Sequence, residues 1–310
     1  MESAQRGGRE GATAKIGGGV MTTELAQEIR RAAALRDRLA IDAGGALRLY
    51  HGDTEGVRGV RLDRYGPHLR LELFDPLAGG APELESLLDG VASLLPAGGT
   101  LFLLERYLGH GGPVAVRGAV SDGVGVVTEG RARFRIELAR ARNTGLFLDS
   151  RAARRWLAEL AVEGAVLNLF AYCCAFGVVA RLAGAAVTVN VDMSRAPLAR
   201  GADNYALNGL AAPPRTFLRG DVRARLPWLA RRGQRFALIV VDPPPTAPVP
   251  TADRLFPLLA EGGRLLWCHH GRKQPPLPGG FTVVEERPPD PDFPGPPVTR
   301  TFLLAREAGE

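Results

Sequence analysis

This 310-residue sequence has few cysteines, almost no lysine and no long hydrophobic run. Its three cysteines, Cys173, Cys174 and Cys268, are too few for a disulfide scaffold and favour a reducing compartment. No apolar segment reaches the roughly 20 residues of a membrane span, and the start of the chain lacks the apolar core of a signal peptide. We therefore predict a cytoplasmic globular protein with no membrane partner.

The scarcity of lysine makes arginine the carrier of the net charge of +6. Lys15 and Lys273 are the only lysines. A basic balance favours an anionic partner such as RNA. The arginines are spread along the whole chain, however, and arginine with alanine is also what a GC-rich genome encodes. Charge alone therefore does not decide between an RNA partner and a small-molecule substrate.

The first 140 residues predict a tail followed by a small α+β domain. Residues 1–20 are glycine-rich and without periodicity, which predicts a disordered tail. Helices are expected over 22–40 and 82–95, where apolar residues recur at helical spacing. Short β-like runs lie between and after them, at 47–50, 60–62, 69–73, 101–104, 123–127 and 134–138. These elements define a predicted domain over 21–140 that is rich in antiparallel pairs.

From about residue 141 the pattern changes to alternating helix and strand, which predicts a second domain over 141–310. The expected strands are 165–170, 186–191, 216–219, 237–241 and 264–268, with helices before and between them, the last of these helices over 252–259. The last two runs, 281–285 and 301–305, have no helix between them and must pair antiparallel. The predicted fold class is therefore α/β: a Rossmann-like parallel sheet with a terminal antiparallel hairpin.

Three of the apolar runs end in an aspartate: Asp192, Asp221 and Asp242. A ligand across the carboxyl ends of such strands is typical of an open parallel sheet, and Asp192 is placed to accept both hydroxyls of a ribose. The first turn of the sheet contains one glycine, Gly177, instead of the three that let a pyrophosphate approach the backbone. The pattern favours a ribose-bearing cofactor without a pyrophosphate.

At these residues the chain resembles a known family. The segments 143–151 (NTGLFLDSR), 166–177, 189–194 and 242–244 (DPP) are similar to S-adenosylmethionine (SAM)-dependent methyltransferases of class I. The resemblance is to those related to the cytosine-C5 and guanine-N7 methyltransferases of large-subunit (23S) ribosomal RNA, and it covers most of residues 46–307. It implies SAM as the cofactor and transfer chemistry as the activity.

The resemblance also implies roles for individual residues. The methionine end of SAM would contact Asn168, Phe170 and Ala171. The ribose and adenine would contact Asp192, Met193, Asp221 and Val222, and the sulfonium would lie near Asp242 and Pro243 of the Asp-Pro-Pro segment. A wall of the pocket would come from Thr144, Asp149 and Arg151.

The chain departs from the family pattern on the substrate side. After Asp-Pro-Pro, where the family has an aromatic that can stack on a flipped base, this chain has Pro245 and Thr246. About 45 residues precede the matching part, too few for the family's RNA-binding module. The turn residues Cys173, Cys174 and Ala175 replace the usual glycine-containing turn and are expected to narrow the space beside the methionine tail.

Four residues are candidates for catalysis. Tyr172 can stabilise a sulfonium cation with its ring, and Asn143 can orient a nucleophile or the SAM carboxylate. Cys268 can act as the thiolate that a cytosine-C5 methyltransferase requires, or it can be a buried strand cysteine that packs like a small apolar residue. Asp242 completes the set. We expect Phe134, Phe147 and Trp267 in the core. We expect no metal site at Cys268, His269 and His270 with Cys173, because adjacent residues of one strand point to opposite faces and rarely share one metal ion.

Two hypotheses follow. The first is a SAM-dependent enzyme acting on a small molecule, with SAM cyclisation to azetidine-2-carboxylate and methylthioadenosine as its sharper form; some relatives of this fold resemble such SAM cyclases. The cysteines of the turn would then hold the methionine tail in a folded conformation. Asn143, Tyr172 and Asp242 would desolvate the amine of SAM and hold its sulfonium. The alternative is a ribosomal RNA base methyltransferase acting at cytosine C5 or guanine N7.

Overall fold

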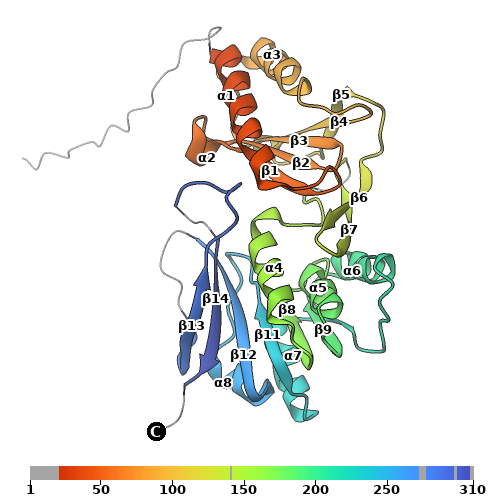
Figure 1. The fold of residues 1–310 in the computed structure, drawn as a ribbon, viewed down its shortest axis with the longest axis vertical. Helices are drawn as coiled ribbons and strands as arrows, with labels where there is room; N and C mark the ends of the chain where they lie inside the picture. Colours follow the sequence, from red (N-terminus) through yellow and green to blue (C-terminus); the bar gives the residue numbers. More distant parts are fainter. Residues whose placement is uncertain (1–20, 140–141, 272–276, 297–298, 308–310) are drawn as a thin grey trace, which may run out of the picture.

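The computed structural model describes residues 21–139, 142–271, 277–296 and 299–307. The predicted tail over 1–20 lies outside these ranges. Figure 1 shows two β-sheets, each with its own helices, stacked along the long axis with a hairpin beside the junction. No helix in the described ranges is long and apolar enough to cross a membrane.

The N-terminal part is a five-stranded sheet covered by two helices. Its strand order is β1-β2-β3-β4-β5, and only the pair β3–β4 is parallel. Helices α1 and α3 pack over a core that includes Ile29, Leu62 and Leu87. The bounds are α1 Met21–Arg36, β1 Ala46–His51, α2 Gly52–Glu55, β2 Val60–Tyr65, β3 His68–Leu73, α3 Gly80–Ala92, β4 Thr100–Glu105 and β5 Val114–Gly118, with 3-10 turns η1 Asp37–Leu39 and η2 Arg106–Leu108. Strand β5 was not predicted because only two of its residues, both valines, have large apolar side chains.

A separate hairpin, β6 (Val124–Glu129) and β7 (Ala132–Glu137), joins the two parts. Its buried Phe134 belongs to a hydrophobic cluster that also contains Tyr65 of the first sheet and Trp156 of the second part. Because one cluster crosses the junction, the two sheets are packed together rather than linked by a bare connection.

The C-terminal part is a seven-stranded sheet in the order β10-β9-β8-β11-β12-β14-β13. Strands β8 to β12 run parallel, whereas β14 and β13 are antiparallel, as predicted. The strands are β8 Ala165–Leu169, β9 Val187–Asp192, β10 Phe217–Arg219, β11 Phe236–Val241, β12 Leu259–His270, β13 Phe281–Arg287 and β14 Thr299–Arg306. The helices are α4 Arg151–Leu160, α5 Ala175–Leu182, α6 Arg195–Leu207, α7 Val222–Arg231 and α8 Ala252–Leu255, with 3-10 turns η3 Leu148–Ser150 and η4 Phe256–Leu258.

Helices cover both faces of this sheet. Residues Val166 and Asn168 of β8 face one side and Leu167 and Leu169 the other, because side chains alternate along a strand. The core on the first side contains residues of α4, α5 and α6, and the core on the second side contains residues of α7 and of the segment 252–258. This arrangement confirms the predicted Rossmann-like α/β fold class. The helix predicted over 252–259 is shorter, because Pro257 ends the α-helical hydrogen bonding and strand β12 already begins at Leu259.

Candidate functional site

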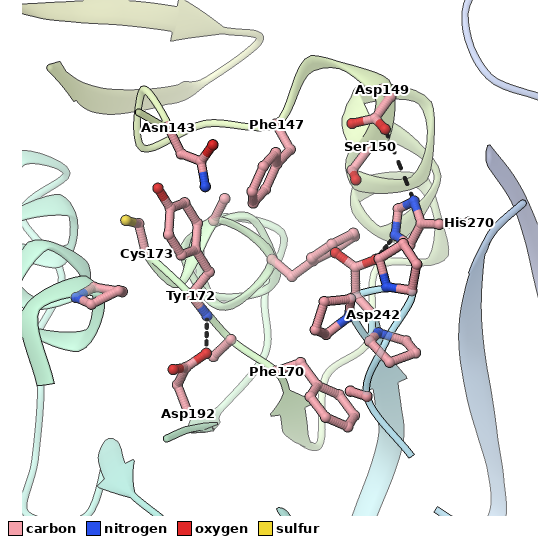
Figure 2. Close-up of a pocket in the computed structure, with 18 of the residues that line it drawn as sticks. Asn143, Phe147, Asp149, Ser150, Phe170, Tyr172, Cys173, Asp192, Asp242 and His270 are labelled. Carbon is pink, nitrogen blue, oxygen red and sulfur yellow. Dashed lines mark hydrogen bonds and ion pairs between the residues drawn. The ribbon is translucent and has the colours of Figure 1, made fainter. Parts of the chain in front are cut away.

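A cavity of about 830 Å³ lies at the carboxyl ends of the parallel strands. The ends of β8, β9, β11 and β12 with the segments that follow them, and the loop before α4, form most of its wall, and Arg154 of α4 and Thr299 of β14 complete it. Figure 2 shows side chains from these segments converging on one space. Ligands bind at this edge of open α/β sheets, so the cavity is the candidate site.

The turn after β8 has an unusual backbone. Phe170, Tyr172 and Cys174 have φ angles of 57°, 47° and 59°, a left-handed region that non-glycine residues rarely adopt. Hydrogen bonds hold the turn: the Tyr172 amide donates to Asp192 at 2.8 Å and the Asn204 side chain donates to the Cys173 carbonyl at 2.9 Å. Such strain persists only where the surroundings over-determine it, and it is concentrated at ligand sites.

The cysteines of this turn do not all narrow the cavity, which corrects the expectation from the sequence. Cys173 and Ala175 line it, but Cys174 is completely buried and points toward α6. A Cβ atom added to Gly201 of α6 would lie 2.4 Å from the Cys174 sulfur. Because Gly201 has no side chain, the Cys174 sulfur can pack against α6, on the side away from the cavity.

Asp192 ends β9 and faces the cavity with a fixed carboxylate. One oxygen accepts the Tyr172 amide and the other accepts the Ser194 amide, each at 2.8 Å. Each oxygen keeps a further lone pair for a ligand. Met193 follows it on the cavity wall and is 67 % exposed, so it is free to pack against a flat ligand.

Asp221 and Val222 are not part of this cavity wall. Asp221 caps α7 by accepting from the Arg223 amide at 2.7 Å, and its other oxygen bonds the Arg223 guanidinium at 2.8 Å. These hydrogen bonds lower the pKa of Asp221. Val222 is buried in the core of the second face. Neither residue therefore lines the cavity in which their adenine contacts were expected.

Asp242 and His270 form a hydrogen-bonded pair on the cavity wall. The distance between Asp242 Oδ1 and His270 Nε2 is 2.7 Å, and Asp149 Oδ2 lies 3.9 Å from His270 Nδ1 (Figure 2). Burial lowers the pKa of His270, but the hydrogen bond and charge of Asp242, with the charge of Asp149, outweigh it and raise the pKa to about 9. His270 is therefore cationic at neutral pH. Sequence reasoning did not assign it a role, and its place at the end of β12 was the available signal. Pro243 lies beside Asp242 on the same wall.

Within the segment 143–151, the structure separates pocket residues from structural ones. Asn143 and Asp149 line the cavity, as does Ser150, which sequence reasoning missed. Ser150 is 1 % exposed, and its Oγ has no hydrogen-bond partner among the described residues. A buried hydroxyl on a cavity wall without a partner indicates a polar ligand atom beside it.

Thr144 and Arg151, expected in the pocket wall, do not line the cavity. Thr144 is buried and donates to the Leu146 carbonyl at 3.0 Å. The Arg151 guanidinium is buried between Asp290 at 2.7 Å and Asp292 at 2.5 Å. Both carboxylates come from the loop between β13 and β14, so Arg151 fastens that loop to α4.

Asn168, expected at the methionine end of SAM, and Gly177, the one glycine of the turn expected beside the cofactor, are also structural. The Asn168 side chain donates to Asn190 at 2.9 Å inside the sheet. Gly177 packs so closely that a Cβ there would lie 2.2 Å from Asn190 Oδ1. Neither lines the cavity, whereas Phe170 and Ala171 do.

The cysteine and aromatic candidates separate clearly by exposure. Cys268 is fully buried, does not line the cavity, and has a pKa raised by burial; these three properties favour the buried-cysteine interpretation over the thiolate one. Phe134 and Trp267 are in the core, as expected. Phe147 is not: it is 44 % exposed and lines the cavity, with its ring centroid 4.9 Å from that of Tyr172. The described residues contain no group of three or more His, Cys, Asp or Glu side chains suited to a metal ion.

Comparison with known proteins places these features in a family. Residues 81–275 match the family described as S-adenosylmethionine-dependent methyltransferase. A ribosomal RNA large subunit methyltransferase of Deinococcus radiodurans is 30 % identical over 246 residues, which are 76 % of this chain and 60 % of that protein. The ribosomal RNA large subunit methyltransferase I of Escherichia coli is 28 % identical over 71 % of this chain and 57 % of its own length. The K/L enzyme of Chromohalobacter salexigens is 35 % identical over 59 % of this chain and 23 % of its own length. This chain thus spans less than two thirds of these relatives.

Solved structures support the fold. A methyltransferase crystallised with S-adenosylhomocysteine superposes with a TM-score of 0.78 at 19 % identity, covering 91 % of this chain and 81 % of that one. A SAM-dependent methyltransferase of Agrobacterium tumefaciens gives a TM-score of 0.58 at 20 % identity, covering 81 % of this chain and 88 % of that one. At these identities the likeness concerns the fold.

Proposed function

Since this chain belongs to the S-adenosylmethionine-dependent methyltransferase family, we propose that it methylates a base of large-subunit ribosomal RNA. The relatives named above support this activity, which is the alternative drawn from the sequence. They give no support to a small-molecule acceptor or to SAM cyclisation. The outward orientation of Cys174 also removes part of the bulk that was expected to press on the methionine tail.

The cavity residues fit SAM, which supplies the methyl group. Asp192 has a fixed carboxylate with lone pairs left for the two ribose hydroxyls. The partnerless Ser150 Oγ offers a hydrogen bond to a polar atom of the amino acid portion. The Tyr172 side chain lies in the same wall and can stabilise a cation with its ring face. These three contacts are the ones we assign to the cofactor.

The buried cysteines decide which kind of acceptor atom we propose. Methylation at cytosine C5 requires a thiolate that attacks the ring and creates a nucleophilic carbon. All three cysteines are buried, and burial raises the pKa of Cys173, the one on the cavity wall, to about 12. A guanine N7 carries its own lone pair and needs no such nucleophile. We therefore propose transfer to a nitrogen lone pair, with guanine N7 as the acceptor.

The Asp242–His270 pair would position the acceptor. A cationic His270 donates to Asp242 and fixes the orientation of that carboxylate in the cavity. The pair is nearly neutral overall, so it can present a hydrogen-bonding surface to a base without a large charge of one sign. In this role the two residues orient the acceptor and do not remove a proton, because N7 has none to lose.

Exposed arginines near the cavity support an RNA partner. Arg142 is next to Asn143 and Arg195 is next to Ser194, both of which line the cavity; Arg219 donates to the Met193 carbonyl at 3.4 Å. None of these three arginines pairs with a carboxylate within the described part of the chain. Uncompensated guanidinium groups at a cavity mouth can bind phosphates and position a nucleic acid.

The test is a methyl-transfer assay with labelled SAM and three substrates: protein-free large-subunit ribosomal RNA, assembled large subunits, and no RNA. Digestion to nucleosides followed by mass spectrometry identifies the product. We expect 7-methylguanosine from at least one of the RNA forms, with S-adenosylhomocysteine as the co-product. The appearance of 5-methylcytidine would overturn the acceptor assignment. Methylthioadenosine from SAM alone, with no RNA methylation, would overturn the function and favour SAM cyclisation.

A further inference from the structure

Phe147 has an unusual position for a large apolar side chain. It belongs to the short segment before η3 (Leu148–Ser150), and its neighbours Leu146 and Leu148 are 3 % and 4 % exposed. Phe147 itself is 44 % exposed and lines the cavity. The neighbouring leucines anchor the segment in the core, so the ring of Phe147 is presented to the cavity and is not needed to hold the loop.

The backbone of Phe147 is also held by a side-chain hydrogen bond, in addition to the two buried leucines beside it. The Phe147 carbonyl accepts a hydrogen bond from Arg154 Nη1 at 2.9 Å. Arg154 is 2 % exposed, and its guanidinium also bonds the Glu129 carboxylate of the β6–β7 hairpin, at 2.7 and 2.6 Å. A ring on such a rigid support loses little entropy when it contacts a ligand.

Phe147 and Asn143 present complementary chemistry to the same space. Figure 2 shows the Phe147 ring beside Tyr172, with Asp192 on the far side of Tyr172, and the Asn143 amide belongs to the wall of the same cavity. One face of Phe147 approaches Tyr172, at an interplanar angle of 38°, and much of the remaining ring is open. The Asn143 side chain is exposed and has no hydrogen-bond partner among the described residues. Its amide offers one donor group and one acceptor.

This pairing of a flat apolar face with an amide edge matches a nucleobase. Bases taken out of a stack are held between aromatic or apolar side chains and are recognised by hydrogen bonds to their edges. The segment after Asp-Pro-Pro supplies no aromatic here, because it contains Pro245 and Thr246. We propose that Phe147 stacks on the target base and that Asn143 hydrogen-bonds its edge, replacing the aromatic that is absent after Asp-Pro-Pro. This inference rests on the proposed RNA methyltransferase function.

The position of Phe147 favours the base over the cofactor as its partner. The residues assigned to the ribose and adenine, Asp192 and Met193, follow β9. Phe147 precedes α4 and lies across Tyr172 from Asp192 (Figure 2). A substitution at Phe147 should therefore change RNA recognition while the affinity for SAM is retained.

The experiment compares wild type, Phe147→Leu, Phe147→Trp and Asn143→Ala. Trp228→Leu on α7 is the matched control, because Trp228 is a partly buried aromatic on the helix layer of the opposite sheet face. Calorimetry gives the Kd for SAM, thermal melting checks the fold, and steady-state kinetics with ribosomal RNA gives kcat and KM. Leucine keeps the apolar volume and removes the ring face, whereas tryptophan keeps a ring face for stacking.

We expect Phe147→Leu to lower kcat/KM for RNA about 10- to 100-fold, the range for loss of one base-stacking contact, with the Kd for SAM within about twofold of wild type. Phe147→Trp should retain most of the wild-type kcat/KM for RNA, because tryptophan keeps a ring face for stacking. Wild-type kinetics in Phe147→Leu would overturn the stacking role and leave the proposed function standing. A parallel loss of SAM affinity would also overturn it, by assigning the ring to the cofactor. If wild type itself methylates no RNA, the proposed function fails, and the base-binding role fails with it.

Discussion

Replacement of Arg151 by methionine separates a structural role from a role in the cofactor pocket. The guanidinium of Arg151 lies between Asp290 and Asp292 at 2.7 and 2.5 Å and donates to the Ala46 carbonyl at 2.9 Å. It thereby joins α4, the β13–β14 loop and the first strand of the N-terminal sheet. Burial opposes the charge of Arg151, but the two carboxylates outweigh burial and raise its pKa. Methionine keeps most of the length and removes the charge.

The expected loss follows from the carboxylates left behind. Asp290 and Asp292 are 5 % and 0 % exposed, so removing Arg151 leaves the buried Asp292 carboxylate without a cation and leaves Asp290 with only the exposed Arg155. Breaking a buried pair in this way costs about 3–5 kcal/mol of unfolding free energy. With an unfolding entropy of roughly 2.1 cal/mol/K per residue, a chain of this size should lose about 5–8 °C in Tm. Arg155→Met is the control: Arg155 also bonds Asp290, but its side chain is 60 % exposed, so the loss should stay below about 1 kcal/mol.

The assay is thermal and denaturant unfolding across pH, with calorimetry for SAM. Burial raises the pKa of Asp292 and the charge of Arg151 opposes that rise, so in Arg151→Met this pKa should rise further. The stability defect should then be largest at neutral pH and shrink as the pH falls through that raised value. SAM affinity should stay within about threefold of wild type. An unchanged Tm together with a large loss of SAM affinity would refute this reasoning and would assign Arg151 to SAM binding instead.

Three further outcomes are expected. Cys268→Ala should keep the rate of methyl transfer within about twofold and cost about 1 kcal/mol of stability, because a buried core atom is lost; a rate loss of several hundredfold would contradict this. Asp192→Asn should weaken SAM binding at least tenfold by calorimetry, since charge-assisted hydrogen bonds to the ribose are lost; unchanged affinity would remove Asp192 from the site. The folded-state pKa of His270, about 9, lies above its unfolded value of 6.5, so its pair with Asp242 contributes stability that is complete below pH 6.5 and lost as the pH rises through about 9. The contribution is at most about 3 kcal/mol, and unfolding curves for His270→Gln should lack that pH dependence.

The order and type of most elements were predictable because their signals are local. In β8, alternate residues belong to the cores on opposite faces of the sheet, and a strand buried on both faces reads as a continuous apolar run. The terminal hairpin was predictable because the segment between β13 and β14 is too rich in proline for a crossover helix. Helix α8 was overestimated because Pro257 interrupts a pattern that otherwise continues.

The site was less predictable because its assembly depends on distant partners. Arg151 directly follows Asp149 and Ser150, which line the cavity, and only the approach of Asp290, 139 residues later, shows that Arg151 points elsewhere. Phe147 lies between two buried leucines, so a hydrophobicity pattern assigns it to the core with them. The pKa of His270 is raised by Asp242, which is 28 residues away in sequence. Asp192 was predictable because strand ends of a parallel sheet have a fixed place whatever their partners.

The turn after β8 shows why this pocket differs from one built on a glycine-rich loop. Left-handed φ angles at Phe170, Tyr172 and Cys174 cost about 1–3 kcal/mol each, which glycine would avoid. Glycine, however, would remove the Phe170 and Tyr172 side chains from the cavity wall. The hydrogen bond from the Tyr172 amide to Asp192 and the packing of Cys174 against Gly201 hold the strained turn in place. Because we propose that Asp192 binds the ribose, the carboxylate that holds this wall in place would also contact the cofactor, and cofactor binding would be coupled to the strained turn through a single side chain.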